Sequence, residues 1–332
     1  MLSLPPALFL VMLGLTIGSF VSLYLLDVHG DTSRNFVVFQ GVLYLIFAGL
    51  TLLAMNAFAT PEIVHGRGLD EHWLTAQGPF VLAFTLVMIP WNVLLWLDRT
   101  PRATGKKAEK PAEDTPDRYA RVRLLRYVVG GATVLVGLAT LFTVGMAYRS
   151  LADSRLDGAF VVASFLAGGL ALGGVMTAML LGHWYLNTPT ASGKPLEFVT
   201  ALMLGALALE LIFSLAIGPS TAHPTLPTVT VSPGTTIQVG GSGAVISTPT
   251  PVPGQTQTPT LDQVRQTPIA PTAMVWLQII TGFLAPLVLG AIALWLTRGR
   301  SFQSATGMLY LCVAFLFLGE ILGRGLLLLP IF

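Results

Sequence analysis

Mostly apolar stretches of about 20 residues recur eight times along the chain, separated by polar segments. Each stretch is long enough to cross the hydrocarbon core of a bilayer as an α-helix. Helices are expected because a backbone in lipid must satisfy its polar groups within the segment. We therefore predict an all-α integral membrane bundle of about eight transmembrane helices, over residues 5–26, 36–58, 79–98, 127–149, 159–185, 197–218, 273–297 and 304–330.

The fifth apolar stretch is rich in small residues, with Gly169 and Gly173 spaced as a GxxxG pair. Small residues let helices approach closely in lipid, where no hydrophobic force drives one helix against another. We therefore predict that residues 159–185 form a central helix of the bundle.

Residues 219–272 break the apolar pattern with a long segment rich in Pro, Thr, Ser and Gly. This composition predicts an extracytoplasmic loop, which acts either as a flexible linker or as a surface for an extracytoplasmic partner. The loop divides the chain into a six-helix membrane region (1–218), the loop itself, and a two-helix membrane region (273–332) that we expect to pack on the first.

Composition supports a membrane protein and charge predicts its orientation. Only 10% of the residues are charged and 53% are hydrophobic, whereas an average soluble protein is about 25% charged. Residues 99–126 hold nine of the 18 Lys and Arg residues, so the positive-inside rule places this segment in the cytoplasm. Thirteen basic residues then lie in cytoplasmic loops and four in outer loops. This predicts a multi-pass plasma-membrane protein with both termini extracytoplasmic.

Two opposite charges stand inside the last apolar stretch, in the sequence FLGEILGRG. Glu320 and Arg324 are four residues apart and therefore share a helix face. Each alone would cost about 3 kcal/mol in the membrane, so both should face the bundle interior. Three further polar residues are predicted at a similar depth, in the outer half of the membrane: Glu210, Gln278 and Asn56.

This outer set supports two interpretations. The ion pair pins the last helix to its neighbours, or the residues form a proton-linked pocket for a polar ligand. In the second case, a carboxylate would exchange protons with a quinol headgroup.

A second candidate group lies at the cytoplasmic end of the fifth span, in LGHWYLN: His183, Trp184 and Tyr185. These residues form either an aromatic belt or a quinone or lipid-headgroup site, in which His183 accepts a proton. The third span could complete such a pocket with Trp91, Asn92 and Trp96, but only if the third and fifth spans are neighbours.

Metal centres are not expected. Cys312 is the single cysteine, which excludes internal disulfides and cysteine-rich metal sites. His183 is the only histidine within a predicted span, which argues against bis-histidine haem ligation. The polar segment 59–78 carries acidic residues and histidines, but their spacing fits a solvated loop better than a metal site. An alternative role for this segment is to dock an outer electron-transfer partner.

The last span also carries a family resemblance. Gly319, Glu320, Gly323 and Arg324 form a Gly-Glu-x-x-Gly-Arg element. With eight spans and outer termini, this element resembles the haem-free membrane anchor subunits of dimethyl sulfoxide reductase-type and polysulfide reductase-type complexes. Leucines replace the aromatic residue that follows the element in that family. The resemblance implies a subunit that exchanges electrons between membrane quinones and an attached iron–sulfur or other redox subunit.

The functional prediction is therefore a membrane anchor subunit of a redox complex that exchanges electrons and protons with quinones. It would have no catalytic centre of its own and no covalently bound cofactor. Its expected partners are membrane lipid and a redox subunit, and no nucleic acid. The alternatives are a small-solute or ion transporter, and a non-catalytic structural or assembly protein.

Overall fold

The computed structural model describes residues 4–58, 69–98, 119–151, 155–188, 191–217 and 271–328. These residues contain eight helices that are long and apolar enough to cross a membrane, as predicted. Seven of them are α1 (Leu4–His29), α2 (Arg34–Phe58), α4 (Glu71–Leu97), α5 (Ala120–Tyr148), α6 (Arg155–Asn187), α7 (Lys194–Ile217) and α11 (Phe302–Leu328). The remaining span joins α9 (Pro271–Gln278), the π-helix η2 (Ile279–Leu284) and α10 (Ala285–Arg298). The predicted 219–272 loop, except for its last two residues, lies outside the described residues.

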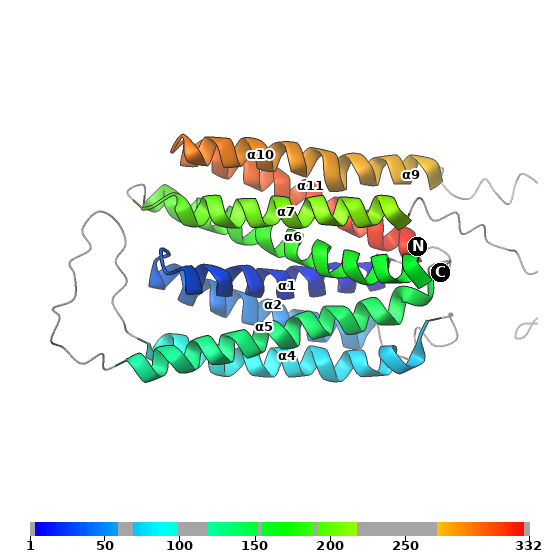
Figure 1. Ribbon diagram of the computed structural model, residues 1–332, viewed down its shortest axis with the longest axis horizontal. Coiled ribbons are helices and arrows are strands. Elements are labelled where there is room, and N and C mark those ends of the chain that lie inside the picture. Colours follow the sequence, from blue (N-terminus) through cyan, green and yellow to red (C-terminus); the bar gives the residue numbers. More distant parts are fainter. Residues whose placement is uncertain are drawn as a thin grey trace, which may run out of the picture.

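The helices run roughly parallel or antiparallel in two groups of four (Figure 1). In the first group, α1 packs on α2 and α5, and α4 packs on α2 and α5. In the second group, α6 packs on α7 and α11, and α10 packs on the same two helices. The groups meet mainly where α1 lies along α6. These are the two most buried spans, with 78% of the residues buried in the apolar window of α1 and 67% in that of α6, which agrees with the predicted central place of the fifth span.

Glycines on both helices make the contact between α1 and α6. Gly14 and Gly18 of α1 face Gly169 and Gly173 of α6. A methyl group added to Gly173 would lie 1.8 Å from the carbonyl carbon of Gly18, and one added to Gly18 would lie 1.8 Å from the carbonyl oxygen of Gly169. The two backbones therefore touch directly, as GxxxG pairs allow.

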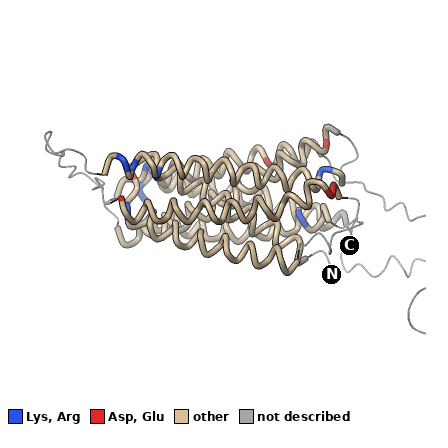
Figure 2. Tube along the Cα trace, turned by 90° about the horizontal axis from the view of Figure 1, so that it is seen from below, with Lys and Arg blue, Asp and Glu red and all other residues tan. Residues whose placement is uncertain are grey.

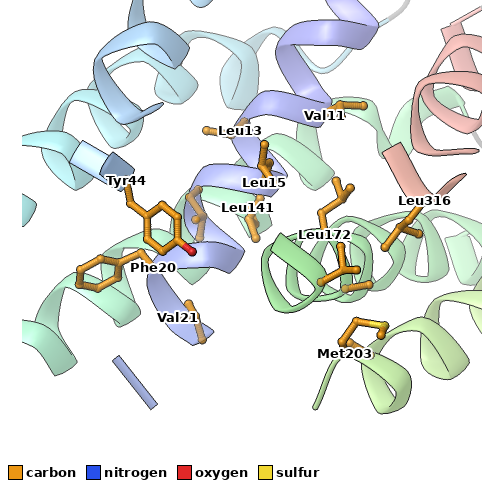
Figure 3. Close-up of a cluster of buried hydrophobic side chains, with 14 of the residues drawn as sticks. Val11, Leu13, Leu15, Phe20, Val21, Tyr44, Leu141, Leu172, Met203 and Leu316 are labelled. Atoms are coloured by element: carbon orange, nitrogen blue, oxygen red, sulfur yellow. The ribbon is translucent and has the colours of Figure 1, made fainter. Parts of the chain in front are cut away.

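The middle of the bundle is mostly apolar. Figure 3 shows a cluster of buried side chains from α1, α5, α6, α7 and α11, among them Leu13, Leu141, Leu172, Met203 and Leu316. All five are buried. A few hydroxyl groups are buried at this level as well and pair with each other, Tyr44 with Thr177 (2.9 Å) and Thr16 with Thr51 (3.0 Å).

Three details differ from the predicted spans. α5 begins at Ala120, seven residues before the predicted start of its span, because a basic segment continues the helix beyond the apolar stretch. α4 begins at Glu71, eight residues before the predicted start of its span, because the polar segment EHWLTAQG is the first part of the helix and buries Leu74 and Gln77. In the seventh span, η2 precedes Pro286. Proline has no N–H and its ring crowds the carbonyl four residues earlier, so a wider turn at this position relieves the clash.

The two ends of the bundle differ in charge. α1 begins and α11 ends at one end, here called the termini end (Figure 1). The opposite end, here called the basic end, carries most of the Lys and Arg residues in the described part of the chain (Figure 2). Those residues are Arg34, Arg121, Arg123, Arg126, Lys194, Arg298 and Arg300.

The glycine contact predicts a large difference between two Gly→Ala substitutions. Gly173→Ala should lower the thermal midpoint in detergent by many degrees, because the added methyl group has no space against α1. Gly205→Ala in α7 should leave the midpoint unchanged or raise it, because nothing lies within 4 Å of the added methyl group and alanine favours helix by about 1 kcal/mol. Equal midpoints for the two variants would contradict the α1–α6 contact.

Candidate functional site

Arg324 of α11 is the centre of a buried ionic cluster near the termini end. Its Nε lies 3.1 Å from Oε2 of Glu320, one helical turn earlier, and its Nη2 lies 3.6 Å from Oε1 of Glu210 on α7. On α6, Ser164 accepts two hydrogen bonds from the guanidinium, at Oγ (3.1 Å) and at the carbonyl oxygen (3.3 Å). The guanidinium also lies 4.1 Å above the ring of Phe165. Three helices therefore hold one arginine from all sides.

Small residues make room for this cluster. A methyl group on Gly168 of α6 would lie 2.4 Å from Oε1 of Glu210 and 2.8 Å from Nη2 of Arg324. On α11, a methyl group on Gly319 would lie 2.0 Å from Cα of Gly282 in η2. The first glycine admits the charged groups between helices, and the second fixes the register of α11 one residue before Glu320.

The charges in this cluster do not balance. Glu210, Glu320 and Arg324 are 3%, 6% and 7% exposed, so water does not screen them. Two ionised carboxylates beside one guanidinium would leave a net negative charge in the bundle. Moreover, both carboxyl groups contact the same guanidinium, and Oε2 of Glu210 has no hydrogen-bond partner among the described residues. A protonated carboxyl group can donate a hydrogen bond to a neighbouring carboxylate, whereas a second carboxylate cannot.

The other two members of the predicted outer set lie in different surroundings. Gln278, at the end of α9, is half-buried beside α11, and a methyl group on Gly323 would lie 2.6 Å from its Nε2. It therefore packs one residue from Arg324. Asn56 is exposed near the end of α2, a helix that contributes none of the groups bonded to Arg324.

The second predicted group diverges in the structure. His183 is exposed, and its Nδ1 lies 3.1 Å from the hydroxyl of Tyr310 on α11. Trp184 makes an edge contact with Phe36 of α2. Tyr185 donates a hydrogen bond to the carbonyl of Ser192 (2.7 Å). The three side chains thus contact different neighbours, on α11, on α2 and in the segment after α6.

The third span, α4, packs away from the helix that carries His183. α4 packs on α2 and α5, and it makes no extensive contact with α6. Trp91 is buried against Phe20, Asn92 is buried beside Gly41, and Trp96 is exposed. Equal depth in the membrane therefore did not make these residues neighbours of His183.

Sequence reasoning missed a second ionic cluster at the basic end. Arg126, at the start of α5, lies 3.2 Å from Oδ2 of Asp27 at the end of α1 and 2.5 Å from Oδ2 of Asp98 just after α4. All three side chains are almost fully buried. The signal was present in the sequence as charges at three predicted span boundaries, but such charges usually face solvent.

Metal ligands are not grouped in the described part of the chain. No set of three His, Cys, Asp or Glu residues there could hold a metal ion. In the polar segment 59–78, residues 59–68 lie outside the described part, Asp70 forms an ion pair with Arg149 (3.4 Å), and His72 makes an edge contact with Trp73.

Comparisons with known proteins add no relative to this picture. No protein-family model matches the chain, and no curated protein matches it significantly.

The cluster at the basic end predicts that Arg126→Met is strongly destabilising. Removing the arginine leaves Asp27 and Asp98 buried with a counter-charge lost, which typically costs about 3–5 kcal/mol. Arg298→Met is the matched control, because Arg298 is exposed and lies 3.8 Å from Glu197, and exposed ion pairs contribute about 0–1 kcal/mol. Denaturant unfolding in detergent measures both. Similar losses would mean that Arg126 is not a buried counter-ion.

Proposed function

We propose that this chain is a membrane subunit of a redox complex that exchanges protons and electrons with a membrane quinone. In this proposal Glu210 and Glu320 hold one proton beside Arg324 and pass protons between the quinone headgroup and the termini end. The observation that carries the proposal is the pair of buried carboxyl groups that share a single guanidinium.

The size of the electrostatic terms favours a shared proton. Two like charges 4 Å apart repel by about 4 kcal/mol at an effective dielectric constant of about 20, and an unbalanced buried ion costs several kcal/mol more. One bound proton removes both penalties and leaves the Arg324 charge neutralised. A carboxyl pair that holds one proton can accept or release it when a ligand changes the local charge.

A route from the lipid to the cluster is supported by the packing of α9 on α11. Gln278 is half-buried there, and the neighbouring side chains of Leu277 and Ile280 are exposed on the apolar surface. A quinone tail would lie along that surface, and the amide of Gln278 would donate a hydrogen bond to a headgroup oxygen. The headgroup would then lie within a turn of Glu320 and Arg324.

The redox step requires a partner protein. A quinol that is oxidised loses an electron pair and both hydroxyl protons. The protons would leave through the carboxyl pair, and the electrons would pass to an iron–sulfur or other redox subunit. The positive-inside rule favours a cytoplasmic basic end, so the termini end and this partner would be extracytoplasmic. The Gly-Glu-x-x-Gly-Arg resemblance of residues 319–324 supports the same assignment.

The two alternative functions have less support. Transporters commonly bind substrate near the middle of the membrane between broken helices, whereas in the middle of this bundle α1 and α6 touch through glycines and the buried side chains are mostly apolar. A purely structural ion pair would need one carboxylate for Arg324, and the second carboxyl group has no evident packing role.

The proposal predicts a protonated carboxylic acid in the purified protein. Infrared spectra in H₂O and D₂O should contain the carbonyl stretch of a buried carboxylic acid. Glu210→Gln and Glu320→Gln should each remove it, because one neutral amide leaves the remaining carboxylate balanced by Arg324. Glu197→Gln is a control on the same helix as Glu210, and its carboxylate is more exposed. A spectrum without the band in the wild-type protein would refute the shared proton.

Quinone binding is tested separately, with two amide substitutions. A short-tailed quinone added to the purified protein should bind saturably, and Gln278→Leu should weaken binding by up to about tenfold, the value of one hydrogen bond. Asn56→Leu is the matched control, because it removes an exposed amide of α2. Binding that does not saturate, or that falls equally in both variants, would contradict the quinone assignment while leaving the shared proton intact.

A further inference from the structure

A groove at the basic end lies between the first turns of α2 and the last turn of α4. Its volume is about 440 Å³, and it is lined by Arg34, Asn35, Val38, Phe39, Val42 and Trp96. This volume lies within the range of about 300–1,000 Å³ that is typical of small-molecule sites. The polar residues stand at the outermost turn and the apolar residues follow toward the membrane interior.

Arg34 gives this groove a fixed positive charge. Its Nε donates to the carbonyl of Asp98 (2.6 Å), and its Nη2 donates to the carbonyls of Leu95 (3.2 Å) and Trp96 (3.0 Å). These acceptors are backbone carbonyls at the end of α4. They hold the guanidinium in place, and the partial negative charge of a helix C-terminus offsets only part of its full positive charge. Among the described residues, no carboxylate forms an ion pair with Arg34.

The acidic side chain nearest to the carbonyls that hold Arg34 is paired elsewhere, because the carboxylate of Asp98 binds Arg126. The first turn of α2 adds the partial positive charge of a helix N-terminus beside Arg34. An anion at the mouth of the groove therefore meets attraction from both sources.

The apolar wall of the groove faces outward. Phe39 is 60% exposed and Trp96 61% exposed. Along α2 the exposed apolar surface continues through Val42, Ile46, Leu50 and Leu53, which is the face expected against lipid. Tryptophan is enriched at the level of lipid headgroups, which places the mouth of the groove at that level.

We propose that this groove binds an anionic glycerophospholipid of the leaflet at the basic end. The phosphate lies against Arg34 and the amide of Asn35, and one acyl chain lies along Val38, Phe39 and Val42. Basic pockets between transmembrane helices are suited to anionic headgroups. The lipid would join α2 to α4 at the groove, and this inference does not depend on the quinone proposal.

The test uses the full chain in nanodiscs, with lipids whose acyl chains carry bromine and quench tryptophan fluorescence. Brominated phosphatidylglycerol should compete for the site several-fold better than brominated phosphatidylcholine. Arg34→Gln should reduce this preference by about fivefold, since one basic residue near an anionic headgroup contributes about that factor. Because Arg34 also bonds the end of α4, a second variant, Val42→Phe, narrows the groove with a larger side chain that adds no tryptophan and leaves Arg34 in place. It should weaken saturable binding of both lipids.

Matched controls stand outside the groove at the same end. Arg300→Gln removes an exposed arginine that donates to the carbonyl of Ala191, and Trp295→Phe changes an exposed tryptophan of α10. Both should retain the wild-type lipid preference. The proposal is overturned if Arg300→Gln lowers the preference as much as Arg34→Gln, because attraction would then be general to the basic end. Unchanged saturable binding in Val42→Phe would also overturn it.

Discussion

Charged groups inside this bundle are stable only where other helices supply their counter-charges and hydrogen bonds. Arg324 depends on α7 for Glu210, on α6 for Ser164, and on its own helix for Glu320. Arg126 depends in the same way on Asp27 and Asp98 from two other segments. Each arginine therefore fixes the position of several helices at once, because any helix that moves away leaves an unpaired buried charge, which typically costs several kcal/mol.

This requirement can be met only because the helices approach one another closely. In lipid there is no hydrophobic force between helices, so close packing and polar contacts must hold the bundle together. Gly169 and Gly173 bring α6 against α1, and the neighbouring Gly168 leaves space for Glu210 and Arg324 on another side of the same helix. One short glycine-rich segment thus serves both the contact between the two helix groups and the ionic cluster.

The sequence alone was enough to predict the membrane spans and part of the candidate site. Eight apolar stretches of the right length predicted eight helices, and the four-residue spacing of Glu320 and Arg324 predicted a shared face. The place of Ser164 could not be predicted, because which helix lies opposite Arg324 depends on packing across 160 residues of chain.

A shared depth in the membrane did not predict which side chains contact one another. His183, Trp184 and Tyr185 are consecutive, so their side chains leave the helix about 100° apart, and each meets a different neighbour. Asp27, Asp98 and Arg126 stand at span boundaries, where hydropathy cannot distinguish a solvated charge from a buried one. Only the arrangement of α1, α4 and α5 brings these three residues together.

The position of the two clusters limits what a proton could do in this protein. The Glu210–Glu320 pair lies about 10–12 Å from the termini end, at 1.5 Å per helical residue, and the Arg126 cluster lies at the opposite end. Between these levels the core is mostly apolar, and Leu13, Leu141 and Leu172 are buried there. Buried hydroxyl groups also lie between the two levels, in the Thr16–Thr51 and Tyr44–Thr177 pairs. Because the carboxyl pair lies much nearer the termini end, a proton that it exchanged in the proposed function would have its shorter route to water at that end.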